Sequence, residues 1–256
     1  MEQKSHLMKT INESQKIQYE KLDKSICKEL LSRFEPHISK YKNNDSIKIL
    51  DIGGASGHFA LEVKEYFADK NCEVIVVDNT AFDTWGEFSN KIKFIQSSAD
   101  NLDTFFGENT FDLIFVNRLF HHLVRESWKK TIDGISSIMG KIYKILKNDG
   151  QLCITDHFYN GLVFDNICSK IIYMASSSTF KPIMKICKKI GSLSAGVGVC
   201  FLSYNMWLKL LSENNLQIEK LDLTNKEIIR AKYKKILLLN SKNTLDNIII
   251  AKKKII

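Results

Sequence analysis

The chain has 256 residues, 44% of them hydrophobic and 26% charged, which suits a globular protein of one α/β domain with additions. Its formal net charge is +8. No apolar stretch follows the early lysines, so we expect no signal peptide. The longest uncharged run, 190–208, is interrupted by glycine, serine and asparagine and is too polar for a membrane span.

The six cysteines show no CxxC pair and no cysteine–histidine spacing typical of a metal site. We therefore expect free thiols, no bound metal and a cytoplasmic location. The positive charge is concentrated late in the chain. Residues 161–190 hold five lysines and one aspartate, and residues 226–256 hold nine basic and two acidic residues. The rest of the chain is slightly acidic.

Residues 1–45 predict an N-terminal helical cap, because Ile26, Leu30, Leu31 and Phe34 are spaced as one face of a helix. This segment either covers a ligand or packs as an ordinary helix. The apolar run 47–52 then predicts a buried strand. It ends in a glycine-rich turn, 53–57, which is followed by an amphipathic helix. Glycines let the backbone approach a ligand closely, and the helix N-terminus offers free N–H groups.

Four more strands alternate with helices up to residue 160. We predict them at 72–77, 91–96, 111–116 and 151–155, with a clear helix over 127–146. This alternation indicates a parallel sheet covered by helices on both faces, and ligands bind such sheets at the carboxyl ends of the strands. Polar side chains follow those strand ends, among them Asp78, Asn117 and Asp156.

The pattern changes between residues 160 and 200. Phe164, Ile167, Ile171 and Met174 predict one helical stripe that packs inward, and Pro182 opens a second helix. After this insertion, Ser203 is expected to cap a helix, and 216–223 and 247–251 read as the last two strands. Residues 225–240 are ambiguous between helix and strand. We expect a single domain over 1–256: the cap, a core over 46–159, a helical lid over 160–200, and a final helix and strands over 201–256.

The motifs together resemble those of class I S-adenosylmethionine-dependent methyltransferases. They are Ile-Leu-Asp-Ile-Gly-Gly-Ala-Ser-Gly (49–57), Val-Val-Asp (76–78), Ser-Ala-Asp (98–100), Phe-Asp-Leu-Ile-Phe-Val-Asn (111–117) and Leu-Lys-Asn-Asp-Gly-Gln-Leu (146–152). The match covers about residues 46–156 in the family's order. It implies a doubly wound, seven-stranded, mostly parallel Rossmann-like sheet. It also implies S-adenosylmethionine as cofactor and S-adenosylhomocysteine as product.

The resemblance assigns cofactor roles by position. The methionine part of the cofactor would be surrounded by Asp51 and by the turn residues Gly53, Gly54, Ala55 and Gly57. Asp78, with its neighbour Asn79, would bind the ribose, and Asp100 would accept a hydrogen bond from the adenine amino group. Asn117 would lie beside the cofactor at the end of the fourth strand. Asp100 could instead only cap the helix that follows it. The family's middle glycine is Ala55 here. Its methyl group is tolerable in size but argues against a left-handed backbone at that position.

A nicotinamide- or flavin-binding protein is the main competing interpretation. Its GxGxxG fingerprint requires glycine at position 58, where this chain has His58, and no phosphate-binding P-loop motif is present.

Four of the six histidines follow predicted strand ends. His157 and Tyr159 are the first candidates for contact with the acceptor or for proton transfer. His121 and His122 are further candidates, although they also resemble a structural feature of the family. His58 reads as a residue that starts a helix.

We therefore expect a methyltransferase acting on an oxygen or nitrogen of a small-molecule acceptor. A nucleic-acid methyltransferase that uses the basic tail, Lys252–Lys254, and a non-catalytic partner protein with the same fold are the alternatives. A nucleic-acid partner is not expected, whereas the basic amphipathic insertion leaves contact with a membrane surface open.

Overall fold

The computed structural model describes residues 13–162, 164–189, 194–223, 239 and 244–254. These residues form a seven-stranded sheet in the order β3-β2-β1-β4-β5-β7-β6. Strands β1 to β5 are parallel, and β7 runs antiparallel between β5 and β6. The strands are β1 (Ser46–Ile52), β2 (Asn71–Asp78), β3 (Lys93–Gln96), β4 (Phe111–Asn117), β5 (Leu146–Phe158), β6 (Leu216–Asp222) and β7 (Thr244–Lys253). The expected mostly parallel α/β sheet is confirmed.

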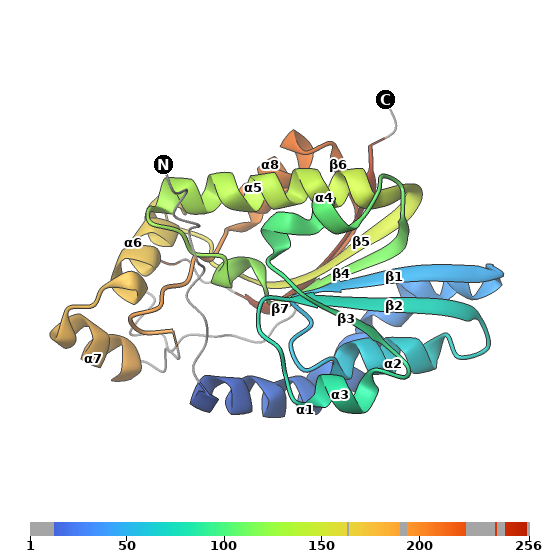
Figure 1. Cartoon of the computed structure of the whole chain (residues 1–256). Coiled ribbons are helices and arrows are strands. Elements are labelled where there is room, and N and C mark those ends of the chain that lie inside the picture. Colours follow the sequence, from blue (N-terminus) through green and yellow to red (C-terminus); the bar gives the residue numbers. More distant parts are fainter. Residues whose placement is uncertain (1–12, 163, 190–193, 224–238, 240–243, 255–256) are drawn as a thin grey trace, which may run out of the picture.

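Helices cover both faces of this sheet (Figure 1). Figure 1 shows α1, α2 and α3 below the sheet and α4, α5 and α8 above it. The helices are α1 (Glu13–Ile38), α2 (His58–Tyr66), α3 (Thr84–Phe88), α4 (Leu102–Phe105), α5 (Trp128–Ile145), α6 (Asp165–Ser177), α7 (Lys181–Lys189) and α8 (Tyr204–Glu213). Short 3-10 helices η1 (Ser39–Asn43), η2 (Ala99–Asn101) and η3 (Phe120–His122) join them.

Two apolar layers hold the helices on the sheet. Below it, Phe34 of α1 and Phe59 of α2 meet Phe115 of β4 edge to face, with ring centroids 5.3 and 5.2 Å away. Above it, Ile135, Ile138 and Met139 of α5 are fully buried against the sheet. Burying an aromatic or branched side chain contributes about 1.5–3 kcal/mol, so these layers supply most of the stability. The second half of α1, with Leu30, Phe34 and Ile38 buried, packs on the lower layer.

The helix starts follow the capping signals in the sequence. The Ser127 hydroxyl accepts from the backbone N–H of Lys130 at the start of α5, and Ser203 accepts from Met206 at the start of α8. Three strands have bounds that differ from the expectation by two residues or more: β5, β3 and β7, which spans Thr244–Lys253 rather than 247–251. β5 is longer at both ends, because its pairing with β4 skips from Leu146 to Gln151 and its pairing with β7 extends to Phe158. β3 begins only at Lys93.

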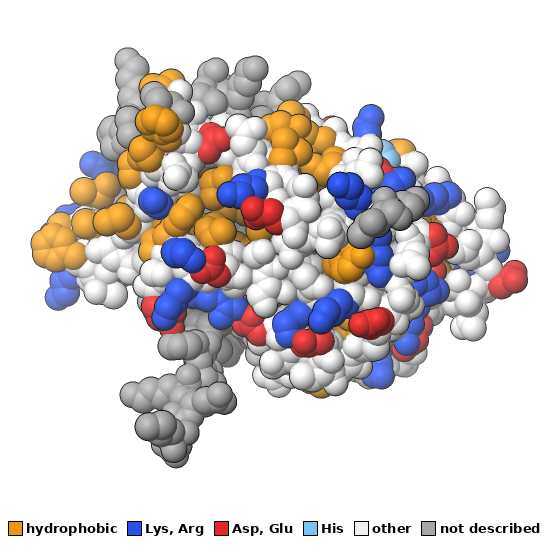
Figure 2. All heavy atoms as spheres, turned by 90° about the horizontal axis from the view of Figure 1, so that it is seen from above, with side chains coloured by type: hydrophobic (Ala, Val, Ile, Leu, Met, Phe, Trp, Pro, Cys, Tyr) orange, Lys and Arg blue, Asp and Glu red, His pale blue; other side chains and the backbone are white. Residues whose placement is uncertain are grey.

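The insertion forms the two expected helices, but the predicted inward stripe of α6 is wrong. Phe164, Ile167 and Met174 are exposed, and Ile171 is half-buried. The opposite side of α6 is the packed one, with Cys168, Ile172 and Tyr173 buried. Hydrophobic side chains gather at this end of the molecule in Figure 2. The helix is apolar on two sides, and periodicity alone does not tell which side faces the protein.

Some expectations lie outside the described residues. They concern residues 1–12 of the cap, residues 190–193 of the insertion and most of the ambiguous segment 225–240. All six cysteines are buried and free. No described helix is long and apolar enough to cross a membrane.

Candidate functional site

The turn after β1 has the backbone geometry of a close-approach loop. Gly53 and Gly57 have φ of +72° and +83°, in the left-handed region that favours glycine. Gly54 has no room for a side chain, because a Cβ there would lie 2.5 Å from the Asp51 carboxylate. Gly57 is also the N-cap of α2, so the turn delivers the chain directly to a helix N-terminus.

Ala55 also has a left-handed backbone, with φ of +45°, contrary to the expectation from its methyl group. Two contacts hold it there. Its N–H donates to Asp78 Oδ2 at 3.1 Å, and its carbonyl accepts from Trp85 Nε1 at 2.8 Å. Left-handed backbone costs an L-residue about 1–2 kcal/mol, which these hydrogen bonds and the neighbouring glycines offset. The backbone of the turn is therefore held in one conformation by these contacts.

Asp78 lies at the end of β2 and is tied to this turn. Besides Ala55, the backbone N–H of Thr80 donates to Asp78 Oδ1 at 2.9 Å. The next residue, Asn79, accepts from the Thr80 hydroxyl at 3.0 Å. The Gly53 N–H donates to the carbonyl of Val77 at 2.7 Å, so the ends of β1 and β2 are joined. The structure therefore brings Asp51, the glycine turn and Asp78 together.

Asp100 has a partner that the sequence did not indicate. Its carboxylate forms an ion pair with Arg125, and Ser98, the N-cap of η2, donates to it at 3.3 Å. The cap of that helix is Ser98 rather than Asp100. A carboxylate offers about four lone-pair positions, so Asp100 retains capacity for a further donor.

Asn117 ends β4 and carries an unsatisfied buried group. Its Oδ1 accepts from the Thr155 hydroxyl at 3.2 Å, whereas its buried Nδ2 has no hydrogen-bond partner among the described residues. An unpaired buried amide costs about 1–3 kcal/mol, so a ligand acceptor at this position would be stabilising. The following residue, Arg118, has φ of +52° and pairs through Nε with Asp246 at 2.6 Å.

Three histidines form one cluster at the ends of β4 and β5. The ring of His121 lies 4.1 Å from that of His122 and 5.2 Å from that of His157, between centroids. Phe201 covers the cluster, with its ring 4.9 Å from that of His121. A Cβ atom on Gly53 would lie only 2.8 Å from the side chain of Leu119. The segment that leads from β4 to the histidines therefore runs beside the glycine turn.

Hydrogen bonds assign different tautomers to two of these histidines. His121 Nδ1 lies 2.6 Å from Asp156 Oδ1, so that nitrogen donates to the carboxylate and Nε2 keeps its lone pair. His157 Nδ1 instead accepts the backbone N–H of Asp246 at 3.1 Å, so its proton is on Nε2. His121 is the proton acceptor of the cluster, and His157 is a donor.

Burial sets the protonation of the cluster. Desolvation, followed by the charge of Arg118, lowers the pKa of His121, and desolvation lowers that of His157 to about 4. Desolvation also lowers the pKa of His122 well below its usual value. Burial raises the pKa of the Asp156 carboxyl to about 6. Near neutral pH the imidazoles are therefore neutral and Asp156 is ionised.

Tyr159 is separated from this cluster by Phe201. Its ring stacks on that of Phe201 at 4.2 Å, and its side chain is buried beside Cys168 of α6. His58, at the start of α2, lies 2.8 Å from the Ser56 hydroxyl through Nδ1 and is not part of the cluster. The sequence also did not single out Phe201 or Asp246. Both come from segments distant in the chain and carry no motif.

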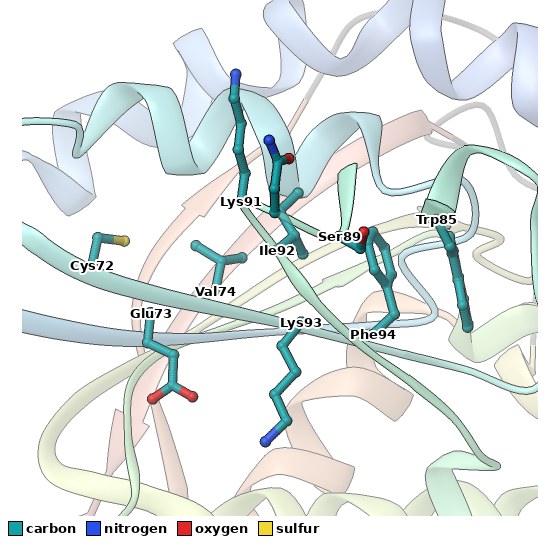
Figure 3. Close-up of a pocket in the computed structure, with 10 residues that line it drawn as sticks. Cys72, Glu73, Val74, Trp85, Ser89, Lys91, Ile92, Lys93 and Phe94 are labelled. Carbon is teal, nitrogen blue, oxygen red and sulfur yellow. The ribbon is translucent and has the colours of Figure 1, made fainter. Parts of the chain in front are cut away.

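A hollow of about 510 Å³ lies elsewhere, at the sheet edge formed by β3. It is lined by the amino-terminal half of β2, by α3 with the residues after it, and by the start of β3. Figure 3 shows Lys91 and Lys93 pointing in opposite directions there, with Trp85 and Phe94 at one end. None of the expected site residues lines this hollow, so it is separate from the site at the strand ends.

The chain matches known methyltransferases over most of its length. A family model described as a methyltransferase domain matches residues 19–221. Over 120 residues the chain is 30% identical to the phosphoethanolamine N-methyltransferase of Plasmodium falciparum (isolate 3D7). That alignment covers 47% of this chain and 42% of the relative, so the similarity extends over less than half of that protein.

Solved structures share the fold. One is the 1,6-didemethyltoxoflavin-N1-methyltransferase of Burkholderia thailandensis with bound 1,6-didemethyltoxoflavin and S-adenosylhomocysteine. Its TM-score is 0.55 at 14% identity, over 91% of this chain and 80% of that one. Another is an S-adenosylmethionine-dependent methyltransferase of Methanosarcina mazei, with TM-score 0.54 at 16% identity, over 86% and 98%. These likenesses show the fold alone. The family match carries the assignment: the chain belongs to the methyltransferase domain family.

Proposed function

We propose that this enzyme methylates the nitrogen of a small amine, with His121 as the base that removes the amine proton. The observation that carries the proposal is the short contact between His121 Nδ1 and Asp156. It leaves a lone pair on Nε2 of a neutral imidazole, which can accept a proton, although burial lowers the pKa of His121 and so makes it a weak base. The 30% identity to a phosphoethanolamine N-methyltransferase supports nitrogen over oxygen and makes phosphoethanolamine the first acceptor to assay.

The residues at the strand ends fit the cofactor. The buried Nδ2 of Asn117 has no hydrogen-bond partner in the described part of the chain, and the glycine turn opens onto the N-terminus of α2. In this proposal Asp51, Gly53, Gly54, Ala55 and Gly57 hold the methionine part of S-adenosylmethionine. Asp78 and Asn79 bind its ribose, and Asp100 binds its adenine amino group. Asn117 contacts the cofactor at the end of β4. When bound, S-adenosylmethionine supplies an electrophilic sulfonium methyl group that is transferred by in-line displacement.

The chain's own groups orient and deprotonate the acceptor. Asp156 holds the imidazole of His121 in one tautomer and stabilises the positive charge that develops when Nε2 takes a proton. His157, with its proton on Nε2, donates a hydrogen bond to the acceptor. His122 packs on His121 and helps to keep water out. Tyr159 shapes the wall of the acceptor site through Phe201, and the insertion forms its outer cover.

The basic tail, Lys252–Lys254, gives little support to the alternative of a nucleic-acid methyltransferase. Lys252 pairs with Glu219 at 2.8 Å, and Lys253 is buried and donates to Asn109 at 2.8 Å. These two cations serve the protein's own structure, which disfavours a nucleic-acid acceptor. The imidazole–carboxylate pair also favours an active enzyme over a non-catalytic partner protein. Six buried cysteines, none of them in a disulfide, are suited to a reducing compartment and support a cytoplasmic enzyme.

The direct test is methyl transfer from labelled S-adenosylmethionine to ethanolamine, phosphoethanolamine and a catechol as an oxygen acceptor. We expect methylated amine with the wild type and loss of it in His121→Gln. Transfer only to the catechol, or full amine methylation by His121→Gln, would overturn the proposal.

A further inference from the structure

The insertion exposes a group of large apolar side chains to solvent. Of the eleven large hydrophobic side chains that are exposed among the described residues, six lie between residues 162 and 186. They are Leu162, Phe164, Ile167, Met174, Phe180 and Ile186, and we call them the insertion patch. Phe164 and Phe180 are 62% and 64% exposed. Such clustering in a folded protein indicates a surface that contacts something else.

Part of the patch follows α6, with Phe164 at its N-cap and Ile167 and Met174 within it. Phe164, Ile167 and Met174 recur at helical spacing on one face, with half-buried Ile171 between them. The opposite face anchors the helix. Trp128 Nε1 donates to the Ser169 hydroxyl at 2.9 Å, and the Tyr173 hydroxyl donates to the carbonyl of Arg125 at 2.7 Å. The outward apolar face is therefore held in a fixed orientation.

The charges carried by the insertion itself are mostly positive. The insertion carries five exposed lysines: Lys170, Lys181, Lys185, Lys188 and Lys189. Its single acidic residue between 161 and 190, Asp165, already accepts from the Gly161 N–H at 3.0 Å and from Asn205 Nδ2 at 2.9 Å. Figure 2 shows lysine and arginine side chains beside the hydrophobic ones at this end of the molecule.

We propose that the insertion patch docks the enzyme on the surface of an anionic lipid bilayer. A bilayer surface accepts both parts of the patch, because apolar side chains enter the interface while lysines stay with the anionic headgroups. Nucleic acid offers no partner for six apolar side chains. A symmetric second copy would bring two positively charged insertions together. Because no described helix can cross a membrane, the attachment is peripheral.

This docking goes beyond the proposed chemistry. Figure 1 shows α6 and α7 beyond the carboxyl-terminal edge of the sheet, at the end where the histidine cluster lies. The attached enzyme would therefore turn its acceptor side toward the membrane. Amine methylation does not require the attachment, so the two proposals fail independently.

The test is flotation of the purified full chain with vesicles of phosphatidylcholine alone and with added phosphatidylserine, at low and high salt. A basic residue near an anionic surface contributes about fivefold to partitioning, so five lysines predict strong dependence on phosphatidylserine and release by salt. We expect little binding to phosphatidylcholine alone.

Two variants separate the contributions. Phe164→Ser combined with Phe180→Ser should reduce binding to mixed vesicles at least about tenfold, because apolar insertion is lost. Phe105→Ser is the matched control, since Phe105 is 48% exposed on α4, outside the insertion. Lys185→Gln with Lys188→Gln should weaken binding to mixed vesicles about 25-fold and reduce its salt dependence, because two of the five lysines are removed. S-adenosylhomocysteine binding by each variant checks that it is folded.

Absence of binding to phosphatidylserine vesicles, or equal binding by the double phenylalanine variant, would overturn the proposal. So would a wild-type dimer in sedimentation equilibrium that dissociates in that variant, because a second copy would then cover the patch.

Discussion

His121 Nδ1 lies 2.6 Å from Asp156 Oδ1, and this contact joins the 3-10 helix after β4 to the end of β5. The same carboxylate oxygen accepts the backbone N–H of His157 at 2.7 Å. Asp156 therefore fixes the ring orientation of His121 and does so from a rigid strand. That relationship separates the roles of the clustered histidines, which their positions in the sequence do not.

The first prediction concerns the base. His121→Gln should lower kcat for amine methylation about 10²- to 10⁴-fold with little change in affinity for S-adenosylhomocysteine, because a general base acts on the chemical step. His157→Gln should have a smaller effect, since His157 is a donor. Steady-state kinetics and calorimetry measure the two quantities. A parallel loss of cofactor affinity in His121→Gln would instead indicate that His121 only supports the structure.

The second prediction concerns pH and stability. The folded-state pKa of His157 is about 4, below the ordinary 6.5, so the unfolded chain binds a proton first as pH falls. The contribution of His157 to stability is complete above pH 6.5 and is lost as pH falls toward 4. Between pH 8 and pH 5 this amounts to about 2 kcal/mol.

Urea unfolding of wild type and His157→Gln at pH 8 and pH 5 measures this contribution. The variant should lose about 2 kcal/mol less than the wild type over that interval. Asp156, whose pKa is raised to about 6, acts in the opposite direction in both proteins. An identical loss in both would contradict the assignment.

The third prediction concerns backbone strain in the cofactor turn. Ala55→Gly should stabilise the protein by up to about 1 kcal/mol, because it relieves a left-handed alanine at the cost of some chain entropy. Gly57→Ala should destabilise it by more than about 1 kcal/mol, because φ is also positive and the new Cβ would lie 2.8 Å from Phe94. Thermal or urea unfolding tests the contrast in sign. Two changes of the same sign would refute it.

The fourth prediction uses two neighbouring carboxylates. Asp100 pairs with Arg125, and Asp103 pairs with Lys141. Only Asp100 is proposed to bind adenine, so Asp100→Ala should weaken S-adenosylhomocysteine binding about tenfold or more. That factor corresponds to the free energy of one hydrogen bond to a charged group. Asp103→Ala should leave it unchanged. Equal effects of the two variants would show that the ion pairs, and not a direct contact, matter.

Local patterns were enough to predict most of the fold. The alternation of strands and helices, the glycine turn and the Ser203 cap of α8 depend on residues close together in the chain, and the structure confirms them. The outward face of α6 was predicted wrongly because that helix has apolar residues on both sides. The left-handed Ala55 was missed because its partners, Asp78 and Trp85, lie more than twenty residues away.

The tautomers of the clustered histidines could not be predicted from the sequence either, because they also depend on partners distant in the chain. His157 receives its hydrogen bond from Asp246, 89 residues later, on a strand that enters the sheet antiparallel beside β5. Nothing near His157 in the chain indicates that partner. The sequence placed histidines at the strand ends, and the long-range pairing decides which of them can accept a proton.

The most direct test of the account is calorimetric titration of wild type and Asp78→Ala with S-adenosylmethionine, S-adenosylhomocysteine and NAD. We predict that the wild type binds the first two and not NAD, and that Asp78→Ala loses this binding while remaining folded. Binding of NAD, or undiminished binding of S-adenosylhomocysteine by Asp78→Ala, would contradict the cofactor site described above.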